Sequence, residues 1–450
     1  MKFSKLALAA ALGILSGPVL AVGADEAAKL GGELTPVGAE KAGNAAGTIP
    51  AWTGGITKAP AGFKEGDHYP NPFNGEKAKF TITASNMSQY AANLTAGQQA
   101  LLKKYPTWKM NVYPTHRTAA FPQAIYDASK ANATRVKLAP GGLGFDGTSV
   151  GVPFPIPKTG VEPILNHITA YRGDSFAVSN QQVAATTSGS YTPVRFEYEY
   201  DFHYNNLRKS PADREDNKLT NFLQTVTAPA RLAGQVLLIH EYINQIKNPR
   251  QAWSYNPGQR RVRLAPNVAY DNPGVAADGL RTNDDFTLFN GATDRYNWTL
   301  VGKKEIYVPY NSYDLGSNKI KISDIIRPGH INPDHARYEL HRVWVVEAKL
   351  KDGTSHIYSR RTFYIDEDSW TILAADAYDG RGQLWRVAEQ HVLQAYDIPG
   401  INPTAEVHHD LQSGRYLAMG LVNEESKVYR RISRNSGDFS PSGLRNLGTR

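Results

Sequence analysis

The sequence predicts a mainly β protein with an α-helical cover (α+β), centred on a large curved antiparallel sheet or unclosed β-barrel with helices on its concave side. Two observations predict this fold class. Apolar and charged residues alternate strictly over residues 194–204, which is the period of a half-buried strand. Four strand-like runs separated by short turns follow between residues 342 and 394, a pattern that is typical of an antiparallel meander.

The first 24 residues have the pattern of a secretory signal peptide. Lys2 and Lys5 give a positive start, an apolar stretch covers residues 6–15, and small residues precede residue 25. The apolar stretch is shorter than the ~20 residues that a membrane-spanning helix needs. We therefore expect an exported protein that is soluble after removal of residues 1–24 and has no transmembrane segment.

The remaining chain is expected to divide into an arm and one domain. Residues 25–80 are rich in Gly, Ala and Pro without a sustained period, which predicts an extended arm. Residues 81–450 are expected to form a single open-barrel domain. Its helices are predicted mainly within residues 81–175, and its strands mainly within residues 191–422.

Helix start signals are few. Thr95 with Gln98 three residues later forms a capping box, and Pro106 ends the helix that follows it. Pro122 and Pro163 are each suited to the first turn of another helix. Three or four short helices are therefore expected.

Strand signals dominate from residue 191 onward. The run 194–204 has one aromatic or aliphatic face and one charged face. Residues 256–259 (Asn-Pro-Gly-Gln) have the composition of a type II turn, which predicts a hairpin. The other predicted strands are residues 234–242, 251–255, 260–264, 342–350, 356–365, 370–378, 383–394 and 415–422. This number of strands is enough for one large curved sheet.

An elongated, mainly apolar cavity is expected on the concave side, because the face of so wide a sheet exceeds what the few helices cover. Tyrosine supplies an apolar ring with a polar tip, which suits an amphiphilic ligand. The candidate ligand-binding residues are Phe196, Tyr198, Tyr200 and Phe202, or Trp253 and Tyr255, whichever set turns inward. In the alternative interpretations, the aromatic face packs on helices, or the arm fills the space as ordinary core.

The sequence lacks the patterns of several catalytic classes. It contains no Cys, which excludes disulfides, thiolate metal sites and cysteine nucleophiles. It has no Gly-x-Ser-x-Gly and no His-Glu-x-x-His motif. The carboxylate pairs Asp284 with Asp285 and Asp366 with Asp368 fall at predicted turns, where Asp is favoured for local hydrogen bonds. We therefore expect no enzyme activity, no catalytic residues and no cofactor.

Histidines are the remaining candidate metal ligands. They cluster at His330, His335 and His341, and again at His408 and His409. Adjacent residues of a strand point to opposite faces, so His408 and His409 do not easily share one ion. The preferred interpretation is polar surface loops without a metal.

Arg360 and Arg361 lie in the middle of a predicted strand and are expected to face opposite ways. A buried arginine is costly unless it is paired. Glu347 on the neighbouring predicted strand is the preferred partner, and the anionic headgroup of a ligand is the alternative.

The formal net charge of +8 is spread along the chain, except for the basic run at residues 429–434. We interpret this run as a solvated tail. The protein is therefore not expected to bind nucleic acid.

Three segments resemble a known family: residues 252–263 (AWSYNPGQRRVR), 289–298 (FNGATDRYNW) and 358–370 (YSRRTFYIDEDSW). They are similar to an exported Gram-negative family of unknown function that is often labelled "outer membrane lipoprotein-sorting protein". The hairpin containing Trp253 and Tyr255 also resembles the hairpin of LolA- and LolB-type lipoprotein carriers. Those carriers are unclosed barrels that hold acyl chains on a concave apolar side plugged by helices.

The resemblance implies a LolA/LolB-like fold and a periplasmic location. It also implies that the protein works together with a resistance-nodulation-division exporter and an outer-membrane protein. The expected function is a periplasmic carrier or chaperone for hydrophobic or lipidic molecules. Two alternatives stay open: a periplasmic carbohydrate-active enzyme that uses carboxylates, and a docking scaffold that binds no ligand.

Overall fold

The computed structural model describes residues 22–214, 217–433 and 437–448. The predicted signal peptide falls mostly on residues 1–21, which lie outside the described residues. Within the described ranges, no helix has both the length and the apolar character that crossing a membrane requires.

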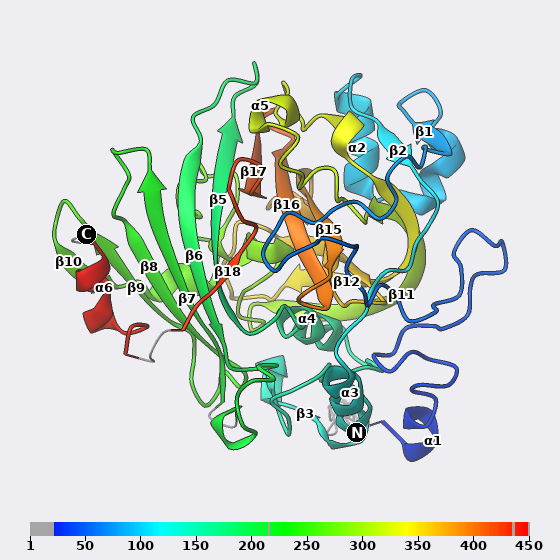
Figure 1. Cartoon of the computed structure of the whole chain (residues 1–450), viewed down its shortest axis with the longest axis horizontal. Helices are drawn as coiled ribbons and strands as arrows, with labels where there is room; N and C mark the ends of the chain where they lie inside the picture. Colours follow the sequence, from blue (N-terminus) through cyan, green and yellow to red (C-terminus); the bar gives the residue numbers. More distant parts are fainter. Residues whose placement is uncertain (1–21, 215–216, 434–436, 449–450) are drawn as a thin grey trace, which may run out of the picture.

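The structure is dominated by one sheet of 16 strands that does not close and is antiparallel except where β2 meets β12 (Figure 1). Along the sheet the strands are β1 (Phe80–Ile82), β2 (Met110–Val112), β12 (Tyr338–Leu350), β13 (Arg360–Asp366), β14 (Ile372–Tyr378), β15 (Leu384–Ala395), β16 (Gly400–Asp410), β17 (Tyr416–Leu421), β5 (Ser175–Ala185), β6 (Val194–Phe202), β7 (Lys218–Ala228), β8 (Val236–Tyr242), β9 (Gln251–Asn256) and β10 (Arg261–Leu264). β11 (Tyr296–Pro309) pairs with β12, and β18 (Arg430–Arg431) pairs with β5. A separate small sheet contains β3 (Lys137–Leu138) and β4 (Phe145–Asp146). The predicted fold class is confirmed.

Helical segments are short. The α-helices are α1 (Ala24–Ala27), α2 (Ala96–Lys104), α3 (Gln123–Arg135), α4 (Val161–Ile168), α5 (Ile322–Ile325) and α6 (Pro441–Gly448). The 3₁₀ turns are η1 (Met87–Asn93), η2 (Pro140–Gly142), η3 (Ala212–Arg214), η4 (Pro266–Ala269), η5 (Asn283–Leu288) and η6 (Pro333–His335). The capping box of Thr95 and Gln98 is present at the start of α2, and α3 begins directly after Pro122, as predicted. Local hydrogen bonding of this kind depends on neighbouring residues, so the sequence predicts it well.

The helical cover lies on both faces of the sheet, whereas the sequence predicted it on the concave side. Ala375 and Asp376 are neighbours in β14 and so point to opposite faces. On one face, Asp376 accepts a hydrogen bond of 3.1 Å from the Gly97 amide of α2. On the other face, Ala375 packs in a cluster with Ile164 of α4 and with Phe289, which follows η5. We call the face with Ala375 the inner face and the face with Asp376 the outer face.

Strand β6 confirms the predicted alternation, with Tyr198 and Tyr200 on the inner face. The opposite side is not the solvent-exposed face that the charged residues suggested, because Glu199 is only 5% exposed. The C-terminal segment covers this region: α6 packs against β8, β9 and β10, and Leu444 shares a cluster with Leu223 of β7 (Figure 1). This covering segment lies more than 200 residues after β6 in the chain. The local sequence pattern of β6 therefore does not indicate that it will be covered.

The basic run near the C-terminus is not a solvated tail. Arg430 and Arg431 form strand β18, which pairs with β5. Arg431 also makes an ion pair of 2.8 Å with Asp174. Backbone pairing and an acidic partner hold the described part of this run on the sheet.

The predicted arm contains few regular elements and packs along the domain. Between α1 and β1 it has no helix or strand beyond isolated bridges. The indole of Trp52 donates to the carbonyl of Ala119 (2.9 Å), and the indole of Trp370 donates to the carbonyl of Val37 (2.9 Å). The division into an arm and a single barrel domain stays a prediction.

The sequence missed four long strands, β5, β7, β11 and β16. Lys303, Lys304 and Glu305 interrupt the apolar alternation of β11, which also has a bulge at Gly302. β16 contains Gly400 and Pro403, residues that are normally depleted in strands. The pairing partners β12 and β15 stabilise these strands although their own propensity is low.

Candidate ligand-binding cavity

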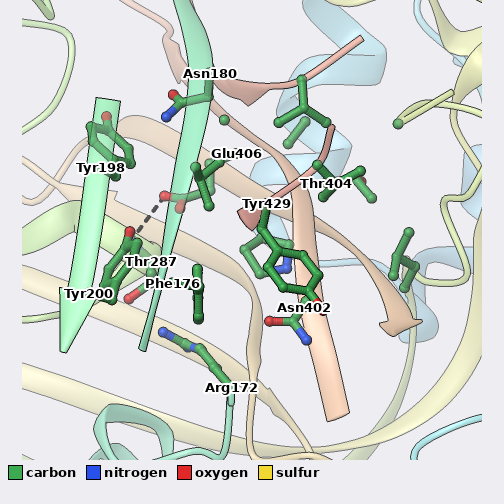
Figure 2. Close-up of a pocket in the computed structure, with 18 of the residues that line it drawn as sticks. Arg172, Phe176, Asn180, Tyr198, Tyr200, Thr287, Asn402, Thr404, Glu406 and Tyr429 are labelled. Carbon is green, nitrogen blue, oxygen red and sulfur yellow. Dashed lines mark hydrogen bonds between the residues drawn. The ribbon is translucent and has the colours of Figure 1, made fainter. Parts of the chain in front are cut away.

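A cavity of about 150 Å³ lies on the inner face between β5, β6, β16 and β17 (Figure 2). Its walls are mainly apolar, and strand alternation explains why: Phe176 and Val178 of β5 point to the same face as Tyr198 and Tyr200 of β6. Met419 of β17 also lines it. The inner face therefore holds a partly open cavity as well as packed core.

Three of the six predicted ligand-binding residues line this cavity: Tyr198, Tyr200 and Phe202. The rings of Tyr200 and Phe202 are stacked with centroids 5.6 Å apart. Phe196 continues the same face but is buried in the neighbouring core cluster. Ligand binding by this set stays a prediction.

Trp253 and Tyr255 do not line the cavity, which corrects their place among the candidates. In the register of the sheet Trp253 lies opposite Leu238 and Tyr255 opposite Val236, and all four pack on the outer face. Leu444 of α6 shares that cluster. These two aromatic residues therefore anchor the C-terminal segment.

A second chamber of about 70 Å³ adjoins the first. The two share five lining residues: Arg172, Tyr200, Phe202, Phe286 and Thr287. The second chamber extends along β7 and β8 toward the 3₁₀ turn η4. The two chambers therefore lie next to each other on the inner face.

The arm and the C-terminal segment close one side of the cavity. Tyr69 of the arm and Tyr429 both line it, and both hydroxyls donate to the carboxylate of Asp397, over 2.9 Å and 2.8 Å. The amide of Gly66 donates to the same carboxylate (3.0 Å). The arm thus fills part of the inner space, while a cavity remains.

Several polar atoms at the cavity wall are buried without a hydrogen-bond partner. They are the hydroxyl of Tyr198, both side-chain amide atoms of Asn180, and Nε and Nη2 of Arg172. Burial raises the pKa of Tyr198, so its hydroxyl stays protonated. Unsatisfied buried polar groups are uncommon in native proteins. They are suited to hydrogen bonding with a polar group of a bound molecule.

The floor of the cavity has a strained backbone. Thr287 has φ +54°, a left-handed conformation that β-branched residues rarely adopt. Its amide donates to the carboxylate of Glu406 (3.0 Å), and its carbonyl is 2.8 Å from Nε2 of the buried His167. Burial lowers the pKa of His167 to about 3, so this imidazole is neutral at pH 7. Such strain is often retained at functional sites.

Arg361 is the inward member of the predicted arginine pair, and its partners differ from those expected. It binds Asp284 (2.8 Å) and Asp285 of η5, and all three groups are buried. Glu347 instead pairs with Arg360 (3.2 Å) on the other face. The local turn bonds predicted for the two carboxylates also exist, because Asp285 accepts from the amide of Thr282.

The histidines are not in exposed loops. His330, His341, His408 and His409 are all buried, and the last two point to opposite faces of β16, as expected. His335 lies in the turn η6.

His341, Asp366 and Asp368 converge, with one ligand atom of each within 4.8 Å of the others. Arg117 already binds both oxygens of Asp368, over 2.8 Å and 2.7 Å. Tyr310 donates to Asp366 (3.0 Å), and burial raises the pKa of Asp366 to about 6. The group is a buried ion-pair network built around Arg117.

The open antiparallel sheet and the mainly apolar cavity on its inner face define the class of protein: a large unclosed β-sheet with few helices. The family model described as "Protein of unknown function (DUF1329)" matches residues 81–445, so the chain belongs to this family. The family resemblance of the three sequence segments is thereby confirmed.

Similar proteins include an uncharacterized protein of Pseudomonas aeruginosa, which is 52% identical over 456 residues. The alignment covers 100% of this chain and 100% of that protein. Among solved structures, a DUF1329 family protein from Desulfovibrio piger has 14% identity and a TM-score of 0.42, covering 62% of this chain and 95% of its own. A LolA superfamily protein from Nitrosomonas europaea has 15% identity and a TM-score of 0.37, covering 63% and 98%.

Sequence reasoning missed the polar residues of the cavity, above all Arg172, Asn180 and Glu406. They come from three separate places in the chain and meet only in the folded sheet. A charged residue in β16 has the same sequence signature whether it faces a cavity or solvent. No local signal in the sequence identifies them.

Proposed function

We propose that this protein is a periplasmic carrier or chaperone for hydrophobic or lipidic molecules, and that it acts without covalent chemistry. The observation that supports this proposal is the cavity of about 150 Å³, with apolar walls and unpartnered polar atoms. Apolar surface removed from water contributes about 25 cal/mol per Å². Partition of an apolar chain into this space is therefore favourable.

The size of the cavity indicates how binding would proceed. An apolar cavity of about 150 Å³ holds a molecule of roughly the size of benzene. A longer chain has to continue into the second chamber or displace the closing side chains Tyr69 and Tyr429. We propose that a partner of the carrier opens this side by competing for Asp397. An envelope exporter and an outer-membrane protein are the proposed partners.

The alternative of a carboxylate-dependent carbohydrate enzyme has weaker support. Such an enzyme needs two carboxylates facing one open cleft. Asp284 and Asp285 are buried against Arg361, and Asp368 is bound by Arg117. The docking scaffold differs from the carrier in binding no ligand, so the same experiment separates the two.

The experiment is titration of the purified protein with a fluorescent fatty acid. Saturable binding is expected, and the variant Val178→Trp should weaken it by about tenfold or more, because the indole occupies the cavity. The matched control is Val301→Trp, since Val301 is 53% exposed on β11 and lies outside the cavity. Circular dichroism checks that both variants fold.

Two results would contradict the carrier. Absence of saturable uptake by the wild-type protein would leave the docking scaffold as the favoured function. Binding by Val178→Trp with wild-type affinity would mean that the probe binds elsewhere.

A further inference from the structure

Among the described residues that line the two chambers, every charged side chain except one has a partner. Glu241 and Arg250 form a buried ion pair of 2.5 Å in the second chamber. Arg281 donates to the carbonyl of Thr282 (3.0 Å). Glu406 accepts the amide of Thr287, as described above.

Arg172 is the exception. It lines both chambers, and its Nε and Nη2 atoms are buried without a hydrogen-bond partner. Figure 2 shows its side chain directed toward Tyr200, Thr287 and Phe176. Within the described part of the chain it forms no ion pair, although Glu406 lines the same cavity.

A guanidinium in this position is energetically unfavourable as it stands. Arginine stays protonated in proteins and presents donors in a fixed planar fork. Burial lowers the pKa of Arg172, and the electrostatic effects of Tyr200 and Glu406, which act in the opposite direction, offset this only in part. A charge that is kept buried and unpaired needs a counter-charge from elsewhere. The neighbouring side chains Phe176, Tyr200 and Phe202 are aromatic and carry no negative charge. The counter-charge therefore has to come from a molecule in the two chambers.

We propose that Arg172 binds the anionic headgroup of an amphiphile whose apolar chain lies along the aromatic wall of β6. The group is a carboxylate or a phosphate, because both accept two parallel hydrogen bonds from a guanidinium. This inference rests on the proposed carrier function and adds the chemical class of the ligand. Arg172 positions the head where the chambers meet, and the chain extends past Tyr200 and Phe202.

The test compares three ligands with the same palmitoyl chain. They are monopalmitoylglycerol, which is neutral, its phosphate ester lysophosphatidate, and palmitate. The wild-type protein is expected to bind at least one anionic ligand about tenfold to a hundredfold more tightly than the neutral one, as measured by displacement of a fluorescent probe. Comparison of lysophosphatidate with palmitate identifies which anion the site prefers.

The variant Arg172→Gln should bind all three ligands with the affinity that the wild-type protein has for the neutral one. Arg172→Lys should keep part of the preference, because it retains the charge but loses the fork. Arg381→Gln, at an exposed arginine in the turn before β15, is the control for net charge and should keep the full preference. Thermal unfolding should show Arg172→Gln to be at least as stable as the wild type, since it removes a buried charge.

The two proposals fail in different ways. If the neutral ligand binds and the wild type shows no preference for either anion, the headgroup inference is overturned while the carrier function stands. An equal loss of neutral and anionic binding in Arg172→Gln would also overturn it. If none of the three ligands binds, both proposals are overturned.

Discussion

Replacing Arg361 by leucine is expected to lower the free energy of unfolding by about 3–5 kcal/mol, because it leaves two buried carboxylates without their cation. Arg361 is 1% exposed and holds Asp284 and Asp285 of η5 against β13. The same turn provides Phe286 and Thr287 to the wall of the cavity. Urea denaturation followed by fluorescence measures the loss.

The neighbouring residue supplies the control. Arg360 points to the opposite face, where it pairs with Glu347 over 3.2 Å with both side chains more than one-third exposed. Exposed ion pairs contribute little, so Arg360→Leu should cost less than about 1 kcal/mol. Similar losses in the two variants would contradict the assignment of inner and outer faces. Probe binding should fall in Arg361→Leu, since η5 is then no longer held in place.

Raising the pH from 5 to 8 is expected to destabilise the wild-type protein relative to Glu389→Gln by about 2–3 kcal/mol. Burial raises the pKa of Glu389 from its ordinary 4.5 to about 7. The folded state therefore binds this proton more tightly than the unfolded state does. The stabilisation that comes from the raised pKa of Glu389 is fully present below pH 4.5 and is lost as the pH rises through 7. The glutamine variant has no such loss, because its side chain does not titrate.

The glutamine can keep both local contacts, because its Oε1 accepts from Gln98 while its NH2 group donates to the hydroxyl of Tyr338, which then acts as the acceptor. In the wild-type protein Glu389 accepts from Gln98 of α2 (3.0 Å) and from the hydroxyl of Tyr338 (2.8 Å). The two proteins should thus have similar stability at pH 5, and the variant should be the more stable at pH 8. Glu33→Gln, at a carboxylate with a side chain that is 78% exposed, is the control. If its difference from wild type grew equally with pH, a general charge effect would explain the result.

Features that depend on neighbouring residues were predictable from the sequence. The capping box of Thr95 and Gln98, the alternation of β6 and the hairpin of β9 and β10 all appear where they were expected. Each is decided by hydrogen bonds or strand geometry within a few residues. Charged or glycine-containing strands such as β11 and β16 were missed, because their partner strands stabilise them.

The sequence by itself determined a large antiparallel sheet with few helices and an aromatic face on β6. The tertiary structure alone decided that this face turns inward, that Trp253 and Tyr255 lie on the other face, and that Arg172 is directed between the two chambers. The physical reason is that a strand pattern has a period of two but does not specify which face is covered. The cover comes from η5, α6 and the arm, which approach the sheet from distant parts of the chain.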